Sequence, residues 1–252
     1  MCQKTEIAQT SGFGSHDNTF IGEQHNHGLS VSDATQIAFG IFREYYPQLK
    51  EELLNSLYSM VIEELNKQET TEIKTPNPRI VVPTLQGASI AEDETIRRLY
   101  AKLLASDMNK KVSDNVHPAF VKIIDQMSPT DAILLKKMHE ISDSIPLARI
   151  TFDFDTRYLT TAMPHYFSPY FDELKDVWAT SLGIENLSRL NLIHLFEGTI
   201  NGYDYTQMKD HPFVKISYLL WKAKIPSLEI KVSEYVIQMN DFGKQFIQVC
   251  LP

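Results

Sequence analysis

Histidine and carboxylate side chains are the groups in this sequence most able to bind a metal ion or transfer a proton. Near the N-terminus, His25 and His27 alternate, and such a pair in a strand places both imidazoles on one face, with His16 shortly before them. Only Asp17 and Glu23 supply carboxylates there, and no cysteine adjoins them. A polar segment without a metal site is therefore the favoured interpretation.

A second candidate group lies in the middle of the chain. His117 together with Asp93 and Glu94 would serve a metal-dependent nuclease or hydrolase. However, Glu92, Asp93 and Glu94 are consecutive, so on a helix they point in different directions and suit the positively polarised first turn better than one ion. The sequence has no Gly-rich phosphate loop, His-Glu-x-x-His helix, nucleophile elbow or Cys-x-x-Cys pair. We therefore assign no catalytic residue, no metal and no cofactor.

Composition indicates a globular protein of one or two domains. The 252 residues are 43% hydrophobic and 22% charged, and the formal net charge is −8. This acidic balance argues against a general polyanion binder, because phosphate contacts need clustered Lys and Arg. The cysteines are Cys2 and Cys250, which fits a reducing compartment. No apolar run approaches the roughly 20 residues of a membrane span, and we expect a cytoplasmic protein.

Residues 1–29 are rich in Gly, Asn, His and Ser, which predicts a flexible tail because too few apolar side chains are present for a core. Self-association is the alternative, since residues 18–26 resemble short Asn- and Gln-bearing β motifs by which bacterial signalling proteins pair with copies of themselves. Amide ladders and a short apolar strand would hold such copies together. The residues for this self-association are Asn18, Phe20, Ile21, Gln24 and Asn26.

Residues 30–67 form the predicted N-terminal helical segment. Apolar side chains recur at four-residue steps from Ile37 to Leu65, with Ala34, Ala38 and Phe42 beside them. Pro47 lies within this pattern, so we expect a kink or two successive helices, the second starting near the proline. Residues 68–88 follow as an extended linker, because their prolines disfavour helix in the residues that precede them.

Residues 89–145 form the predicted central helical unit. Ser89 and Glu92 have the spacing of a capping box, and Pro118 suits the first position of a second helix. A third helix begins with Ser128 as cap and Asp131 in the first turn. These patterns predict three short helices that pack compactly.

The central unit also carries family-like runs. The first helix contains Asp93 and Glu94 and continues as LYAKLLA (99–105), followed by HPAFV (117–121) and MSPTDA (127–132). Together these runs resemble the hallmark of the Abi-alpha abortive-infection family of bacterial phage-resistance proteins. The resemblance implies a role in phage defence and transfers no catalytic residue. The candidate functional surface of this unit is formed by Arg97, Arg98, Lys102 and His117.

Residues 146–252 form the predicted C-terminal domain. Alternation predicts strands at 150–154, 192–195 and 231–239, and the chain between them predicts one helix from Tyr170 to Leu182 that ends at Gly183 and another over 184–191. Residues 187–193 and 239–244 resemble the recognition helix, strand and closing strand of winged-helix domains. The residues able to contact DNA would be Asn186, Arg189 and Asn191. Acidic residues outnumber basic ones over 129–252, so packing or protein binding is favoured over DNA.

The sequence therefore predicts a mainly α protein of the α+β type, with helical N-terminal and central units and a C-terminal winged-helix-like domain containing a small antiparallel sheet. The leading functional hypothesis is a non-enzymatic phage-defence component that acts through a protein partner or self-association, without a membrane span. A winged-helix DNA-binding regulator is the first alternative. A metal-dependent nuclease or hydrolase is the second.

Overall fold

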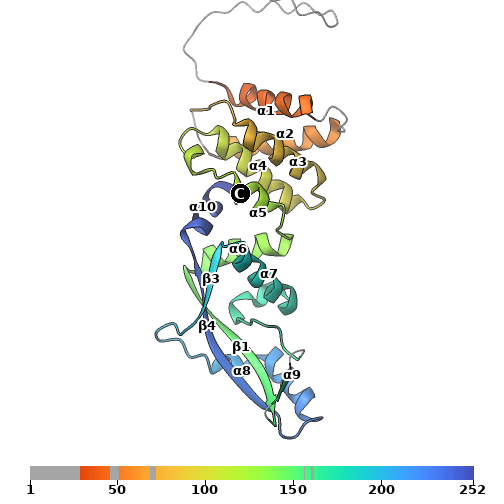
Figure 1. Ribbon diagram of the computed structural model, residues 1–252, viewed down its shortest axis with the longest axis vertical. Coiled ribbons are helices and arrows are strands. Elements are labelled where there is room, and N and C mark those ends of the chain that lie inside the picture. Colours follow the sequence, from red (N-terminus) through yellow and green to blue (C-terminus); the bar gives the residue numbers. More distant parts are fainter. Residues whose placement is uncertain (1–28, 46–50, 69–71, 156, 160–161) are drawn as a thin grey trace, which may run out of the picture.

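A computed structural model describes residues 29–252, apart from 46–50, 69–71, 156 and 160–161. The molecule is elongated, with a stack of helices at one end and the far ends of a sheet with two further helices at the other (Figure 1). The helical stack contains α1 (Val31–Tyr45), α2 (Glu51–Lys67), α3 (Pro78–Ile90), α4 (Glu94–Met108), the 3-10 turn η1 (Ser113–Asn115) and α5 (Ala119–Ile124). The mainly helical fold class is confirmed.

The helical segment over 30–67 is confirmed as α1 and α2, although the buried face of α1 is displaced from the predicted stripe. Ile37 exposes 36% of its surface, and the residues buried completely are its predicted neighbours Ala34, Ala38 and Phe42. In α2, the predicted stripe is buried at Leu57, Val61 and Leu65. The predicted effect of Pro47 lies outside the described residues.

The extended linker predicted over 68–88 is wrong in its second half, where α3 forms. The Asn77 side chain caps this helix by accepting a hydrogen bond of 3.0 Å from the Arg79 N–H. Pro78 follows at the start of the helix, where a missing N–H costs nothing. Burial of Ile80, Val81 and Leu85 against the core then stabilises a helix that contains Pro83 in its interior.

The predicted capping box of Ser89 and Glu92 is also wrong, because Ser89 lies inside α3. Asp93 caps α4 instead, and its side chain accepts a hydrogen bond of 2.7 Å from the Thr95 N–H. Helix α6 (Pro129–Ile141) starts as predicted: the Ser128 N–H donates to Asp131 Oδ2 at 2.7 Å, and the Asp131 N–H donates to Ser128 Oγ at 3.2 Å.

The predicted helix end at Gly183 is wrong. Residues Pro169–Leu174 form a 3-10 helix, η2, and a single helix α7 (Val177–Arg189) runs through the glycine. Gly183 allows α7 to pass close to α6, since a Cβ there would lie 3.0 Å from Asp131 Oδ1 and 3.1 Å from Leu134 Cδ2. The glycine is thus explained by helix packing and not by a turn.

The antiparallel sheet contains β1 (Ser144–Phe154), β2 (Arg157–Leu159), β3 (Ile193–Glu197) and β4 (Glu229–Met239), in the order β2-β1-β4-β3. The two long strands β1 and β4 pair along their length, with Ser144 opposite Gln238 at one end and Asp153 opposite Glu229 at the other. The predicted strands therefore form, and β1 begins earlier than expected. Helices α8 (Gln207–Asp210) and α9 (Pro212–Lys222) lie in the long connection between β3 and β4.

The closing strand predicted near 239–244 is wrong beyond Met239, because α10 (Asp241–Cys250) forms there. The Asn240 side chain caps it by accepting a 2.7 Å hydrogen bond from the Gly243 N–H. Figure 1 shows α10 returning to the helical stack. Its inward side chains, Phe246, Val249 and Cys250, belong to the same hydrophobic core as α1–α7, whereas a second cluster lies under α8 and α9.

Along the chain the elements follow the order α6, β1, α7, β3 and β4, whereas in the sheet β4 lies between β1 and β3. The winged-helix interpretation requires this arrangement. That interpretation stays a prediction, as do the proposed domain boundaries. No helix among the described residues combines the length and the apolar character needed to cross a bilayer.

Candidate functional site

A cavity of about 540 Å³ opens between α3, α4 and α5, and we call it the α3–α5 groove. Its apolar lining includes Ile90, Ile96, Ile124 and Met127. Its polar lining includes Gln86, Glu92, Asp93, Tyr100, Lys122 and Asp125. Ile90 stands out because 78% of its surface is exposed, although Ile80, Val81 and Leu85 on the same helix are buried.

Two hydrogen bonds organise the polar side of the groove. The Tyr100 hydroxyl, on α4, donates to Asp125 Oδ1 at 2.5 Å. Asp125 follows the last residue of α5, and its other oxygen accepts a hydrogen bond of 2.9 Å from Lys122 Nζ. The Asp125 side chain is thereby fixed between a phenol and an ammonium group.

Gly87 lets α3 approach this pair. A Cβ at position 87 would lie 2.5 Å from the Tyr100 hydroxyl oxygen and 2.9 Å from Asp125 Oδ1, so any larger residue would displace them. A glycine in a helix interior lowers helix stability by roughly 0.5–1 kcal/mol relative to alanine. The close packing of α3 against the Tyr100–Asp125 pair offsets that cost.

The groove is better suited to binding than to proton transfer. Burial, and then the hydrogen bond to Asp125, raises the pKa of Tyr100 well above its ordinary value, so the phenol remains protonated at neutral pH. A protonated tyrosine can donate a hydrogen bond but does not act as a base or nucleophile. The free thiol of Cys250 is likewise unreactive, since burial raises its pKa.

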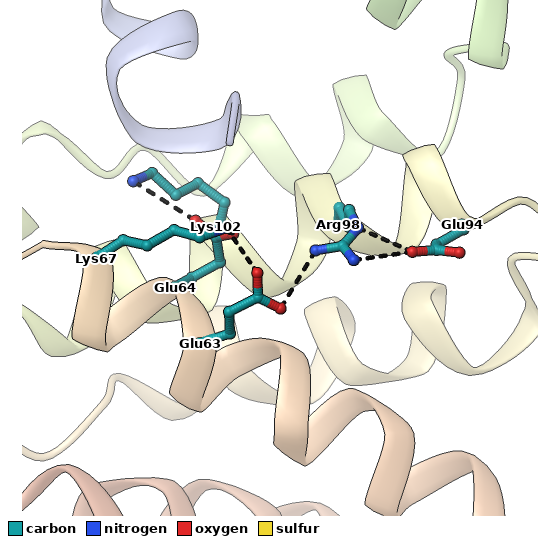
Figure 2. A network of polar contacts seen from close by, with 6 residues as sticks. All are labelled: Glu63, Glu64, Lys67, Glu94, Arg98 and Lys102. Carbon is teal, nitrogen blue, oxygen red and sulfur yellow. Dashed lines mark hydrogen bonds and ion pairs between the residues drawn. The ribbon is translucent and has the colours of Figure 1, made fainter.

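The basic residues predicted as a functional surface lie on α4, and two of them form ion pairs with α2 (Figure 2). Arg98 donates to Glu94 Oε1 at 2.9 Å, and one of its terminal nitrogens lies 3.4 Å from Glu63 Oε2. The hydrogen bond to Glu94 is the main reason that the pKa of Arg98 is raised. Arg98 therefore links two helices, which limits its freedom to contact a ligand.

Lys102 has a similar role beside a buried carboxylate. Glu64 is only 1% exposed, and its Oε1 accepts from Lys67 Nζ at 2.8 Å. Its Oε2 makes no hydrogen bond, and Lys102 Nζ lies 3.8 Å away. The lysine therefore compensates a buried negative charge. The third residue, Arg97, is partly buried on the same helix.

His117 lies at the start of α5. Its Nδ1 accepts a hydrogen bond of 3.1 Å from the Ala119 N–H, and its ring packs near Phe120 and Phe242. Asp93 caps α4 and Glu94 pairs with Arg98, as described above. Each member of the proposed hydrolase group thus has a local structural contact, and the contacts do not bring the three together.

The side chains proposed for DNA contact are partly used within the protein. Asn186 Nδ2 donates to Asp131 Oδ2 at 2.8 Å, and Arg189 donates to Gln126 Oε1 at 2.8 Å. Asn191 has a positive φ of 56°, and its carbonyl oxygen accepts from the Asn240 side chain. These contacts hold α7 against α6 and the turn after α7 against α10.

The predicted self-association residues and the N-terminal histidines lie outside the described residues. Within the part of the chain that is described, no group of three or more His, Cys, Asp or Glu side chains is placed to hold a metal ion. The assignments of a self-pairing motif and of an absent cofactor accordingly stay predictions.

Sequence reasoning missed the α3–α5 groove. In the sequence Tyr100 is visible only as part of the LYAKLLA run, and Asp125 carries no motif. The signal that could have indicated the groove is Gly87, since an isolated glycine inside a helix often has a packing reason, such as a close approach of a neighbouring side chain.

Comparisons with known proteins give one family. A family model described as abortive infection alpha matches residues 48–250, which is most of the chain. No curated protein and no solved structure matches the sequence.

Proposed function

The chain belongs to the abortive infection alpha family, and from this premise we propose that it is a non-enzymatic component of phage defence that acts through protein contacts at the α3–α5 groove. The observation that carries the proposal is the exposed Ile90 beside a groove of about 540 Å³. In this proposal the partner covers the Ile90 side chain, which is 78% exposed, and fills the preformed hollow beside it.

The chemistry of the lining indicates the kind of partner. Ile90, Ile96 and Met127 supply apolar surface, whereas Glu92 and Asp93 supply negative charge on the connection from α3 to α4. A protein segment with an apolar side chain beside a Lys or Arg would complement both. The Tyr100 hydroxyl, which donates its proton to Asp125 Oδ1, would then accept a hydrogen bond from the partner at the edge of the contact.

Phage challenge of living cells tests the proposal. The full-length chain and its Ile90→Lys variant are expressed at matched soluble levels in a sensitive bacterial host, and plaque formation is measured over a broad phage panel. Lysine removes the apolar contact and repels a basic partner segment. The matched control is Ile133→Lys, because Ile133 is an exposed isoleucine on α6, away from the groove lining.

We expect the wild type and the Ile133 variant to lower plaque formation, and the Ile90 variant to lose most of that protection. Full protection by Ile90→Lys would exclude the groove as the contact surface. Unchanged plaque formation with the wild type on every phage would count against the defence role itself.

A winged-helix DNA-binding role is the second candidate, favoured by the β1-β4-β3 order beside α7. Its weakness is that Asn186 and Arg189 already contact α6 and the loop before it. A gel shift at low salt that disappears with Arg189→Ala would support DNA binding. Absence of any shift at low salt would remove this candidate.

A further inference from the structure

Helix α9 presents an apolar face that the described part of the chain leaves exposed. Ile216, Leu219 and Leu220 are 60%, 64% and 64% exposed, and their spacing places them on one side of the helix. The opposite side packs inward through Val214, which is fully buried. A contiguous patch of exposed aliphatic side chains indicates a surface that binds a protein partner or a membrane.

The inward side of α9 is held firmly. The Tyr218 hydroxyl donates to the Leu228 carbonyl oxygen at 3.2 Å, and the Lys222 ammonium donates to the same oxygen at 2.6 Å. The Tyr218 ring also packs edge-on against Phe152 of β1. The helix cannot turn its apolar face inward without breaking these contacts, so the exposed face is a fixed feature of the fold.

The charge around this face is positive although the chain as a whole is acidic. Between Asp210 and Glu229 the sequence contains Lys215, Lys222 and Lys224 and no Asp or Glu, although Lys215 Nζ lies 3.0 Å from Asp210 Oδ1. The formal net charge of the whole chain is −8. The ammonium group of Lys224 lies 4.9 Å from the centroid of the Trp221 ring, next to the aliphatic face.

From these observations we infer that α9 is a membrane-surface helix, which inserts Ile216, Leu219 and Leu220 into the headgroup layer of an anionic bilayer while Lys215 and Lys224 contact the lipid phosphates. Helices that lie in this layer combine an apolar face with flanking Lys, and Trp is common at the same depth. Figure 1 shows α9 at the end of the molecule far from α1, where a flat surface can reach it.

A second copy of the chain fits this face less well. In a symmetric dimer the same surface meets itself, so Lys215 and Lys224 of both copies would approach one another, and within residues 210–228 each copy has only Asp210, the ion-pair partner of Lys215, as an acidic residue to balance them. Anionic lipid headgroups instead attract these lysines, which favours binding to a membrane. A surface helix also agrees with the finding that no described helix could span the bilayer.

Vesicle flotation with the full-length protein tests the inference, and it is independent of the proposed defence role. The probes are vesicles of phosphatidylcholine alone and of phosphatidylcholine mixed equally with phosphatidylglycerol. The test variant replaces Ile216, Leu219 and Leu220 by serine. The matched control is Leu182→Ser, since Leu182 on α7 is 67% exposed and lies outside the α9 face.

We expect the wild type and Leu182→Ser to float with the anionic vesicles and not with the neutral ones. The triple serine variant should bind roughly tenfold more weakly, because it loses the apolar part of the interaction. Lys215→Glu combined with Lys224→Glu should also weaken binding, and added salt should weaken binding of the wild type.

Folding of each variant is verified by its thermal transition, which should match that of the wild type because the replaced side chains are exposed. Flotation of the triple variant equal to that of the wild type would overturn the inference, as would failure of the wild type to bind anionic vesicles. Light scattering on the same samples provides one further outcome: a dimer that the triple variant converts to a monomer would assign the face to self-association and reject the lipid role.

Discussion

The hydroxyl of Tyr100 lies 2.5 Å from Oδ1 of Asp125 and joins two helices across the α3–α5 groove. Tyr100 is buried, whereas the Asp125 side chain is 30% exposed, and Gly87 packs against both. The pair therefore serves as a structural contact between α4 and the end of α5 as well as part of the groove's polar edge.

Replacement of Tyr100 by phenylalanine should lower the free energy of unfolding by about 1–2 kcal/mol, because it removes a hydrogen bond to a carboxylate that is only partly solvated. Urea denaturation measures this loss. Tyr170→Phe is the matched control, since that side chain is 40% exposed, and it should change stability by less than about 0.5 kcal/mol. Equal stabilities of the two variants would show that the bond contributes nothing.

Tyr100 also makes the free energy of unfolding depend on pH in the alkaline range. Its pKa is raised above 10.0 in the folded protein by burial and by the bond to Asp125. The contribution is fully present below pH 10.0, where both states keep the proton, and it is lost as pH rises further because only the unfolded chain releases its proton readily. Urea unfolding at several pH values on either side of 10.0 should show a smaller alkaline decline for Tyr100→Phe.

Other tyrosines contribute to this decline as well, so the variant should retain part of it. Burial is the main cause that raises the pKa of Tyr166, Tyr203 and Tyr205. Identical alkaline slopes for the wild type and Tyr100→Phe would contradict the assignment to Tyr100.

Local motifs made parts of the fold predictable from sequence. Ser128, Pro129 and Asp131 specify the start of α6 within four residues, so no distant contact was needed to find it. The same reasoning failed for α3, because its prolines indicated an extended chain. Pro78 in fact stands at the first turn, and burial of Ile80 and Leu85 favours the helix, which is tertiary information.

The candidate groove could not be predicted for a related reason. Tyr100 and Asp125 are brought together by the packing of α4 against α5, and no local sequence pattern links the two residues. The basic residues of α4 were visible in the sequence, but their partner carboxylates on α2 were not. Arg98 and Lys102 therefore looked free, although Glu63 and Glu64 lie beside them.

Replacement of Lys102 by methionine should lower the free energy of unfolding by about 1–3 kcal/mol, because it removes one of the two cations next to the buried Glu64 carboxylate. Adding Glu64→Gln should recover part of the loss, since the buried charge is then gone. The matched control is Lys122→Met, whose lysine is 74% exposed and pairs with Asp125. That variant should cost no more than about 1 kcal/mol.

A double-mutant cycle over Glu64 and Lys102, followed by urea denaturation, separates the pair from simple loss of packing. Additive effects of the two substitutions would show that the lysine does not compensate the carboxylate.

Replacement of Asp131 by alanine should cost about 2–4 kcal/mol, since its Oδ2 accepts hydrogen bonds from the Ser128 N–H and from the Asn186 side chain while the residue is buried. Asp93→Ala is the matched control, because Asp93 caps α4 from an exposed position and should cost about 1 kcal/mol. Thermal and urea unfolding compare the two. A smaller loss at position 131 than at 93 would contradict the role of Asp131 in joining α6 to α7.

Replacement of Gly243 by alanine should be the most damaging of these single changes, at least about 3 kcal/mol. A Cβ at position 243 would lie 2.0 Å from the backbone oxygen of Leu192, and backbone cannot move aside as a flexible side chain can. Gly40→Ala in α1 is the matched control: no atom lies within 4 Å of its added Cβ, so the alanine should raise helix stability by roughly 0.5–1 kcal/mol.

Because Asn240 also caps α10 and contacts the Asn191 carbonyl oxygen, the alanine at 243 should release α10 from the turn before β3. Urea denaturation and protection of the α10 amides from hydrogen exchange measure both effects, and wild-type protection in the Gly243 variant would be incompatible with this packing.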